Sequence, residues 1–235
     1  MDTVIGILGG MGPEATNYLF AQIVKHTDAG CDREHIPILI YNNPKVPDRT
    51  AAILSDGPSP APAILEGARF LEKSGANFIL MPCITAHYFH PEVSGQINIP
   101  FLHLVEETAA YVRERMSHVK TLGLLSTRGT QKTGLFQTFF EAIGRKIVVP
   151  DENRQPEFGE AVYGECGIKS GYKERPGKML ARLADHLIEK GAEAIIAGCT
   201  EVPLALTPDA IDRPLIDPLE IGARVAILKA GYPVR

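Results

Sequence analysis

Several features are absent from this sequence, and each absence excludes a class of function. No uninterrupted apolar run is long enough to span a bilayer, so a transmembrane protein is not expected. Lysine and arginine together number 24 against 28 aspartate and glutamate residues, which gives a net charge of −4. This weak acidity argues against a sequence-independent nucleic-acid binder, which needs a basic face. We therefore expect neither a membrane nor a nucleic acid as a partner.

Cysteine is scarce, and its spacing excludes two kinds of site. The four cysteines are Cys31, Cys83, Cys166 and Cys199. None belongs to a Cys-x-x-Cys pair, and no Cys/His cluster has zinc-ligand spacing, so we expect no metal site. The first residues include an acid but no basic n-region, which predicts a first strand instead of a signal peptide and a cytoplasmic location. Thiols stay reduced in that compartment, so a disulfide framework is not expected.

The chain alternates between short apolar runs and helix-like stretches along its 235 residues, which are enough for one large domain or two small ones. This alternation predicts an α/β fold with parallel sheets and right-handed crossovers. The expected helices cover 13–26, 61–73, 106–116, 135–143, 179–190 and 218–229, and the further expected strands cover 36–41, 101–104 and 146–149.

Two pairs of segments reveal an internal repeat. The apolar run Val4–Gly10 resembles Thr121–Thr127, and each run precedes small residues and a helix-like stretch. At nearly the same spacing, segment 75–83 resembles segment 191–199. In both members of this second pair, a helix leads into Gly-Ala and then into a strand that ends at a cysteine. Two related pairs at one spacing predict a duplicated unit.

The repeat predicts two pseudo-symmetric lobes, each a mainly parallel sheet flanked by helices, with the active site in the cleft between them. We assign residues 1–116 and 217–235 to the first lobe and 117–216 to the second. Two polar stretches are expected as long loops. One is Pro44–Pro62, with a single helical turn at 50–54, and the other is Asp151–Tyr172. Because long loops in compact domains are often functional, both are candidate site segments.

Ligands of open α/β sheets bind beyond the carboxyl ends of the strands, where this chain has four distinctive segments. From these segments we predict substrate contacts at Gly10, Met11, Ile84, Thr85, Thr127, Thr130, Thr200 and Glu201. Gly9–Gly12 lacks the Gly-x-Gly-x-x-Gly spacing of a dinucleotide site. Its amides are better suited to hold a carboxylate, although a tight strand–helix turn without a ligand is also consistent with the pattern.

Cys83 and Cys199 both lie at strand ends and precede plausible helix starts, where backbone N–H groups stabilise a thiolate. A single free cysteine is most often only a small buried apolar residue. Two cysteines at matching places in two halves instead suggest paired chemistry. One thiolate removes an α-proton while the opposite thiol delivers a proton to the other face, and the roles exchange for the other enantiomer.

Four segments resemble, in order, motifs of the aspartate racemases of the aspartate/glutamate/hydantoin racemase superfamily. They are Gly9–Pro13, Asn43–Arg49, Met81–His87 and Gly198–Glu201, and the resemblance extends over essentially the whole chain. It implies two pseudo-symmetric α/β lobes with the active site between them, no cofactor, and usually a homodimer.

The resemblance also implies roles for single residues. Cys83 and Cys199 match the family's two catalytic cysteines. Arg49 matches a basic residue linked to binding of the substrate's side-chain carboxylate, and Lys169 resembles a second such residue. Two cations suit a small dicarboxylic amino acid, because arginine clamps a carboxylate bidentately while lysine adds a mobile point charge. Aspartate is therefore the expected substrate of a racemase that needs no pyridoxal phosphate.

One residue departs from the family pattern. Ile84 follows the first cysteine where the family usually has asparagine, so an amide donor and acceptor are lost. Three alternatives therefore stay open: a racemase of glutamate or another amino acid, a one-thiol enzyme such as an arylmalonate decarboxylase, and a carboxylate-binding homologue with little turnover. The presence of both cysteines disfavours the decarboxylase type. His87 is placed to tune Cys83, to cap a helix or to pack.

Overall fold

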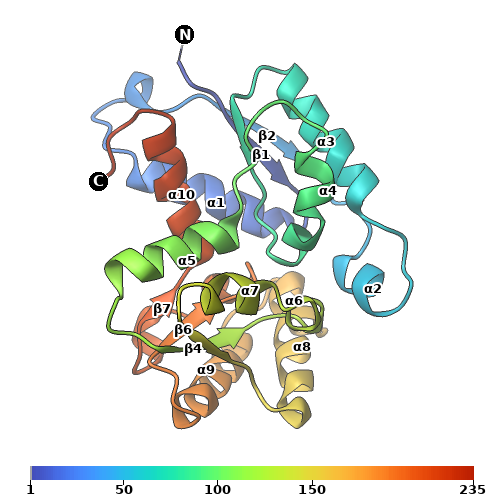
Figure 1. Cartoon of the computed structure of the whole chain (residues 1–235), viewed down its shortest axis with the longest axis vertical. Coiled ribbons are helices and arrows are strands. Elements are labelled where there is room, and N and C mark those ends of the chain that lie inside the picture. The colour runs from blue at the N-terminus through green and yellow to red at the C-terminus, as the bar shows by residue number, and fades with distance from the viewer. Residues whose placement is uncertain (1) are drawn as a thin grey trace. The chain divides into compact units, whose positions relative to one another are not determined.

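The computed structural model describes residues 2–235, which divide into two compact units. Unit 1 comprises the chain up to Glu107 together with Leu219–Arg235, and unit 2 comprises Thr108–Pro218 (Figure 1). The boundary falls within helix α5 (Leu104–Arg115). Among the described residues, no helix is long and apolar enough to cross a membrane.

Unit 1 contains a parallel sheet with the strand order β2-β1-β3. In Figure 1, helices α3 and α4 lie on one side of this sheet, and α1 and α10 lie on the other. The strands are β1 (Ile5–Gly9), β2 (Ile38–Asn42) and β3 (Phe78–Leu80), and the helices are α1 (Pro13–His26), α2 (Arg49–Leu54), α3 (Ala61–Lys73), α4 (His90–Ser94) and α10 (Pro218–Lys229).

The local sequence explains why these elements form. All five residues of β1 are buried, as expected for a central strand of a parallel sheet covered on both faces. Proline occupies the first turn of α1, where its missing N–H has no intrahelical role. Helix α3 buries Ile64, Ala68 and Leu71 at helical spacing and turns its charged residues outward. The predicted bounds of α1, α3 and α10 agree with the structure.

Unit 2 repeats this arrangement with one more strand, in the order β5-β4-β6-β7, and all its strand pairs are parallel. Helices α8 and α9 supply much of its core, with Phe158, Leu180 and Leu183 fully or almost fully buried. The strands are β4 (Thr121–Leu125), β5 (Lys146–Val148), β6 (Ala194–Ala197) and β7 (Leu215–Ile216), and the helices are α6 (Arg128–Thr133), α7 (Leu135–Glu141), α8 (Gln155–Tyr163) and α9 (Glu174–Glu189).

Two equivalent glycines show that the repeat extends to side-chain packing. A Cβ atom on Gly6 of β1 would lie 3.0 Å from the Cβ of Ala76. A Cβ on Gly123 of β4 would lie 3.1 Å from the Cβ of Ala192 and 2.9 Å from that of Leu187. In both units, the central strand therefore needs glycine because the helix and turn that precede the neighbouring strand, β3 in unit 1 and β6 in unit 2, approach it closely.

Two predicted elements are wrong. Residues 101–104 do not form a strand, because only a single bridge joins Phe101 to Ile79, and Leu104 already begins α5. The Nδ1 atom of His103 accepts a hydrogen bond from the N–H of Glu106 at 3.3 Å, and this bond satisfies a donor at the start of that helix. The stretch 151–172 is not a long loop, since it contains α8, whose apolar residues are buried at helical spacing.

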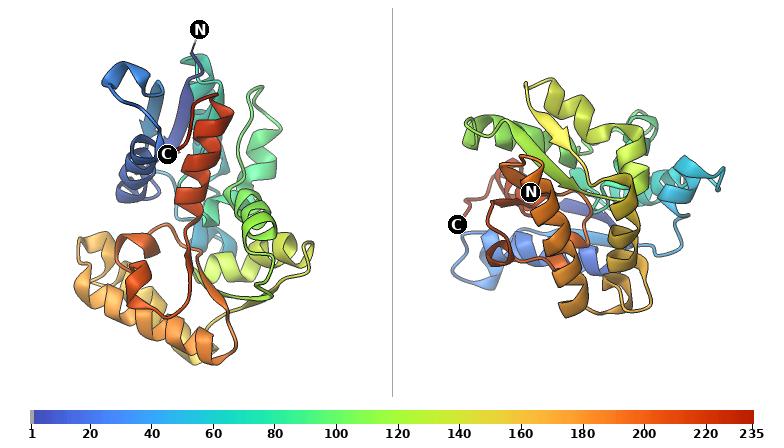
Figure 2. Two further views of the ribbon diagram at one scale, coloured as in Figure 1. Left: turned by 90° about the vertical axis from the view of Figure 1, so that its left-hand side faces the viewer. Right: turned by 90° about the horizontal axis from the view of Figure 1, so that it is seen from below.

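The C-terminal segment returns to the end of α1 after α10 (Figure 2). Thr27 and Val234 form an antiparallel bridge, and the N–H of Arg235 donates to the carbonyl of His26 at 2.7 Å. Within α10, a Cβ atom on Gly222 would lie 2.4 Å from the Cδ2 of Leu104. This helix therefore packs closely within unit 1.

Candidate active site

Cys83 follows β3 and lies in a turn held by a buried histidine. Cys83 is 6% exposed, and the neighbouring Ile84 and Thr85 are also buried. His87 Nδ1 lies 2.9 Å from the carbonyl oxygen of Cys83, and the N–H of Leu104 donates to His87 Nε2 at 3.2 Å. Because Nε2 accepts, the proton of the neutral ring resides on Nδ1 and is donated to Cys83. His87 thus fixes the backbone that carries the thiol.

Three histidines pack together behind this turn. The rings of His87 and His90 each contact His103, with centroids 4.8 and 4.9 Å apart. Burial lowers the pKa of all three rings, and that of His103 falls to about 4. A neighbouring ring is the next largest cause: His103 lowers the pKa of His87, and His90 lowers the pKa of His103. The cluster is therefore neutral near pH 7, and among residues 2–235 no group of His, Cys, Asp or Glu is arranged to hold a metal ion.

The glycine-rich turn after β1 is tied to the segment that leads into α2, whose first residue is Arg49. Gly10 has φ 101°, and a Cβ there would overlap the backbone of Asn43, so both conformation and space require glycine. Its N–H already donates to the hydroxyl of Thr16 at 3.0 Å. The Arg49 guanidinium donates to the carbonyls of Met11 at 3.2 Å and Pro47 at 3.0 Å. The structure thus joins two of the predicted site segments within unit 1.

Cys199 follows β6 and belongs to a compact buried group in unit 2. Its thiol donates to Glu201 Oε2 at 3.0 Å, and the Thr200 hydroxyl donates to the same oxygen at 3.2 Å. Lys169 Nζ donates to the other carboxylate oxygen at 2.6 Å, and it lies 5.8 Å from the centre of the Tyr163 ring. Glu201 is 4% exposed. Lys169, predicted to bind a substrate carboxylate, thus pairs with Glu201, the same carboxylate that accepts from Cys199.

The surroundings of Cys199 disfavour an isolated thiolate. Burial raises the pKa of this thiol well above its ordinary value, and the Glu201 carboxylate raises it further. The Glu201 backbone N–H and the Lys169 charge act in the opposite direction but are outweighed. The protonated thiol is therefore the resting form of Cys199 while Glu201 is ionised.

Thr127 and Thr130 lie together at the carboxyl end of β4. Thr127 caps the short helix α6 by accepting from the N–H of Thr130 at 3.1 Å, and the two hydroxyls are also 3.1 Å apart. Gln155 donates to the carbonyl of Ser126 at 3.1 Å. Sequence reasoning missed Gln155 because it lay in a stretch predicted as loop, and it missed His103 because it lay in a predicted strand.

Comparison with known proteins identifies the family. Residues 8–226 match the family model described as Asp/Glu/Hydantoin racemase, so the chain belongs to this family. It is an amino-acid racemase of that family, with an α/β fold of two mainly parallel sheets flanked by helices.

Individual relatives support the same class. The chain is 28% identical to the broad-specificity amino-acid racemase RacX of Bacillus subtilis over 91% of this chain and 92% of that protein. It superposes on the aspartate racemase of Picrophilus torridus with a TM-score of 0.89 and 28% identity, covering 99% and 96% of the two chains. A glutamate racemase of Francisella tularensis in complex with D-glutamate shares the fold, with a TM-score of 0.66 at 14% identity over 98% and 82%.

Proposed function

We propose that the chain racemises a small dicarboxylic amino acid, with aspartate preferred, by moving the α-proton between Cys83 and Cys199 without pyridoxal phosphate. The observation that carries the proposal is the equivalence of the two cysteines. Each follows the strand beside the central strand of its sheet, each is 6% exposed, and each has a free thiol. The mechanism requires both sulfurs to flank one α-carbon, so that one accepts a proton while the other donates.

Two relatives support different substrate ranges. Likeness to an aspartate racemase favours aspartate, and likeness to RacX favours broader specificity. Ile84, which is fully buried beside Cys83, is consistent with the broader range because it offers no side-chain hydrogen bond. Racemisation assayed by α-deuteration in deuterium oxide, starting from each enantiomer of aspartate, glutamate, alanine and lysine, separates these readings. Absence of exchange from every amino acid would contradict the proposal, as would activity that depends on added pyridoxal phosphate.

Replacing Arg49 with alanine should harm dicarboxylic substrates selectively. The guanidinium is half-buried at the start of α2, next to the glycine-rich turn, and carboxylate recognition by arginine is bidentate. We expect kcat/KM for aspartate to fall by about 10- to 100-fold more than kcat/KM for alanine, in line with loss of a charged hydrogen-bond pair. Arg33→Ala, on the exposed turn at 32–34, is the matched control. Equal losses for both amino acids would remove Arg49 from substrate selection.

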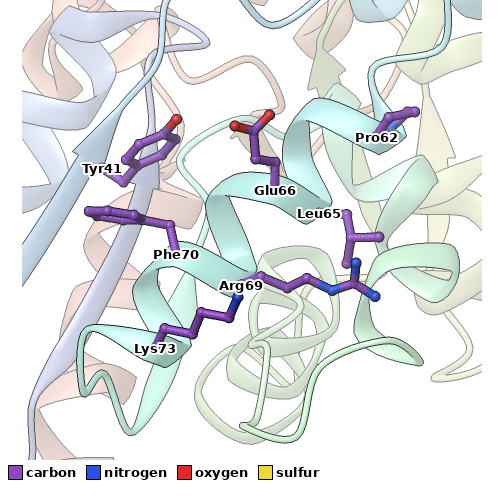
Figure 3. A pocket seen from close by; sticks show the side chains of 7 residues that line it. All are labelled: Tyr41, Pro62, Leu65, Glu66, Arg69, Phe70 and Lys73. Atoms are coloured by element: carbon purple, nitrogen blue, oxygen red, sulfur yellow. The ribbon is translucent and has the colours of Figure 1, made fainter.

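We also propose that the protein forms a homodimer through the outer face of α3. This face borders a pocket of about 500 Å³ between α3 and β2, lined by Tyr41, Pro62, Leu65, Glu66, Arg69, Phe70 and Lys73 (Figure 3). Phe70 is 53% exposed. When two copies of α3 are set antiparallel about a twofold axis centred between residues 67 and 68, Glu66 of one copy lies level with Arg69 of the other. Such a self-complementary stripe is what an isologous interface requires.

Charge reversal tests this interface. Arg69→Glu should weaken the dimer by about tenfold or more, because Glu66 would then face a like charge across the axis. The double variant Glu66→Arg/Arg69→Glu should restore it, since the attraction is only reversed. Sedimentation equilibrium measures both dissociation constants. A monomeric wild type, or a dimer unaffected by Arg69→Glu, would rule out this face.

A further inference from the structure

The Glu201 carboxylate accepts hydrogen bonds from three side chains, one of them the Cys199 thiol. The Cys199 thiol and the Thr200 hydroxyl both donate to Oε2, at 3.0 and 3.2 Å, while Lys169 donates to Oε1 at 2.6 Å. We propose that Glu201 is the proton-exchange partner of Cys199 and that Lys169 holds the single negative charge which the thiol and carboxylate share. This inference rests on the proposed two-thiol racemisation.

Electrostatics explain why the thiol needs a local partner. If Cys199 lost its proton to solvent while Glu201 stayed ionised, two negative charges would lie 3.0 Å apart in a buried site. Transfer to Glu201 avoids this, because the pair keeps one proton and one negative charge throughout. Lys169 lies within hydrogen-bond distance of the carboxylate whichever atom carries the remaining charge. Burial therefore penalises a second negative charge at this site, whereas the proton transfer to Glu201 adds none.

The proposed step is a balanced proton transfer. The S–H bond of Cys199 breaks and an O–H bond forms at Glu201 Oε2, which leaves a thiolate and a neutral carboxyl. The thiolate then takes the substrate α-proton, so that a C–H bond breaks and an S–H bond forms again. For the opposite enantiomer the same path runs in reverse: the Cys199 thiol donates its proton to the α-carbon while the Glu201 carboxyl is neutral, and the resulting thiolate then takes the proton back from Oε2. Glu201 thus prepares Cys199 for the direction in which it acts as the base.

The two halves of the repeat differ at this position. The alignment that pairs Cys83 with Cys199 pairs Thr85 with Glu201. Cys83 instead has its carbonyl held by the neutral ring of His87. The duplicated units therefore share the thiol and its place after a strand, whereas the carboxylate partner at this position belongs to unit 2. Cys83 serves as an internal comparison for any measurement on Cys199.

The substitution Glu201→Gln tests the proposal with two readouts. Glutamine keeps the size and accepts a hydrogen bond, but it does not take a proton at neutral pH. Peptide-resolved mass spectrometry after iodoacetamide treatment should show the alkylation midpoint of Cys199 moving to lower pH by about one unit or more, because an adjacent negative charge is gone. Racemisation should nevertheless fall about 100-fold or more, as expected when proton transfer loses its partner. The alkylation midpoint of Cys83 should not move.

These opposite changes distinguish a proton partner from a mere repelling charge. If Glu201 only disfavoured the thiolate, Glu201→Gln would raise racemisation, and an unchanged or higher rate overturns the proposal. An unchanged Cys199 alkylation midpoint in the folded variant also overturns it. Glu193→Gln is the matched control, since that carboxylate binds the N–H groups of Lys120 and Thr121 at 2.6 and 2.9 Å. Both its readouts should equal those of the wild type.

A second variant covers loss of folding. Glu201→Gln/Lys169→Gln removes both charges of the buried pair and should recover stability if the single variant is poorly folded. Racemisation by this double variant should stay as low as in Glu201→Gln. Full racemisation by the double variant would refute the proposal. A wild-type protein without any α-deuteration would contradict the racemase function itself. The alkylation readout would still report whether Cys199 and Glu201 share a proton.

Discussion

Replacing Cys83 with alanine should lower racemisation by about a thousandfold, and replacing Cys199 should do the same. General acid–base groups contribute about 10²- to 10⁴-fold to a rate, and a two-base mechanism needs both groups in every turnover. Both side chains are small and buried, so alanine preserves most of the packing. The measurement is conversion of each enantiomer, followed by chiral chromatography, together with α-deuteration in deuterium oxide.

The chain supplies its own controls for this experiment. Cys31 is exposed and Cys166 is half-buried, and both thiols are free. Their alanine variants should racemise at the wild-type rate. Cys83→Ala and Cys199→Ala should each retain some α-proton exchange from one enantiomer, because the remaining catalytic thiol still acts on its own face of the α-carbon. Full racemisation by Cys83→Ala or Cys199→Ala would disprove the two-base mechanism.

Acidification should destabilise the fold through the histidine cluster. An unfolded histidine titrates near 6.5, whereas burial holds the pKa of His103 at about 4. Between pH 6.5 and pH 4 the native state therefore binds fewer protons at His103 than the unfolded state does. The contribution of His103 to stability is complete above pH 6.5, declines as the pH falls towards 4, and does not change further below that. The total loss is about 3 kcal/mol, at about 1.4 kcal/mol per pKa unit. His87 and His90, whose pKa values are also lowered, should add to it.

The substitution His103→Asn isolates this effect. The side-chain oxygen of the asparagine can still accept the hydrogen bond from the N–H of Glu106, so the start of α5 keeps its cap. Urea unfolding at several values between pH 7 and pH 4 should show a shallower loss of unfolding free energy than in the wild type. His118→Asn, at an exposed position, is the control and should follow the wild type. An identical pH dependence in His103→Asn and the wild type would exclude the cluster as the cause.

Local patterns predicted much of the fold. The helices 13–26, 61–73 and 218–229 have the predicted bounds because apolar spacing and proline at their first turns are local signals. The two failures also have local causes. Residues 101–104 have the composition of a strand, but the backbone makes a single bridge and a histidine caps the following helix. The stretch 151–172 is polar on average, yet helix α8 buries its few apolar residues.

The sequence by itself determined that Cys83 and Cys199 hold equivalent places in a duplicated α/β chain, because a repeat leaves its spacing in the order of residues. Only the tertiary structure decided what surrounds each thiol. Cys83 is held by a neutral histidine whose partner Leu104 is distant in the chain, and Cys199 faces a carboxylate paired with Lys169. Hydrogen bonds, burial and charge depend on which distant residues meet in space. Such tertiary contacts leave no periodic signal in the sequence.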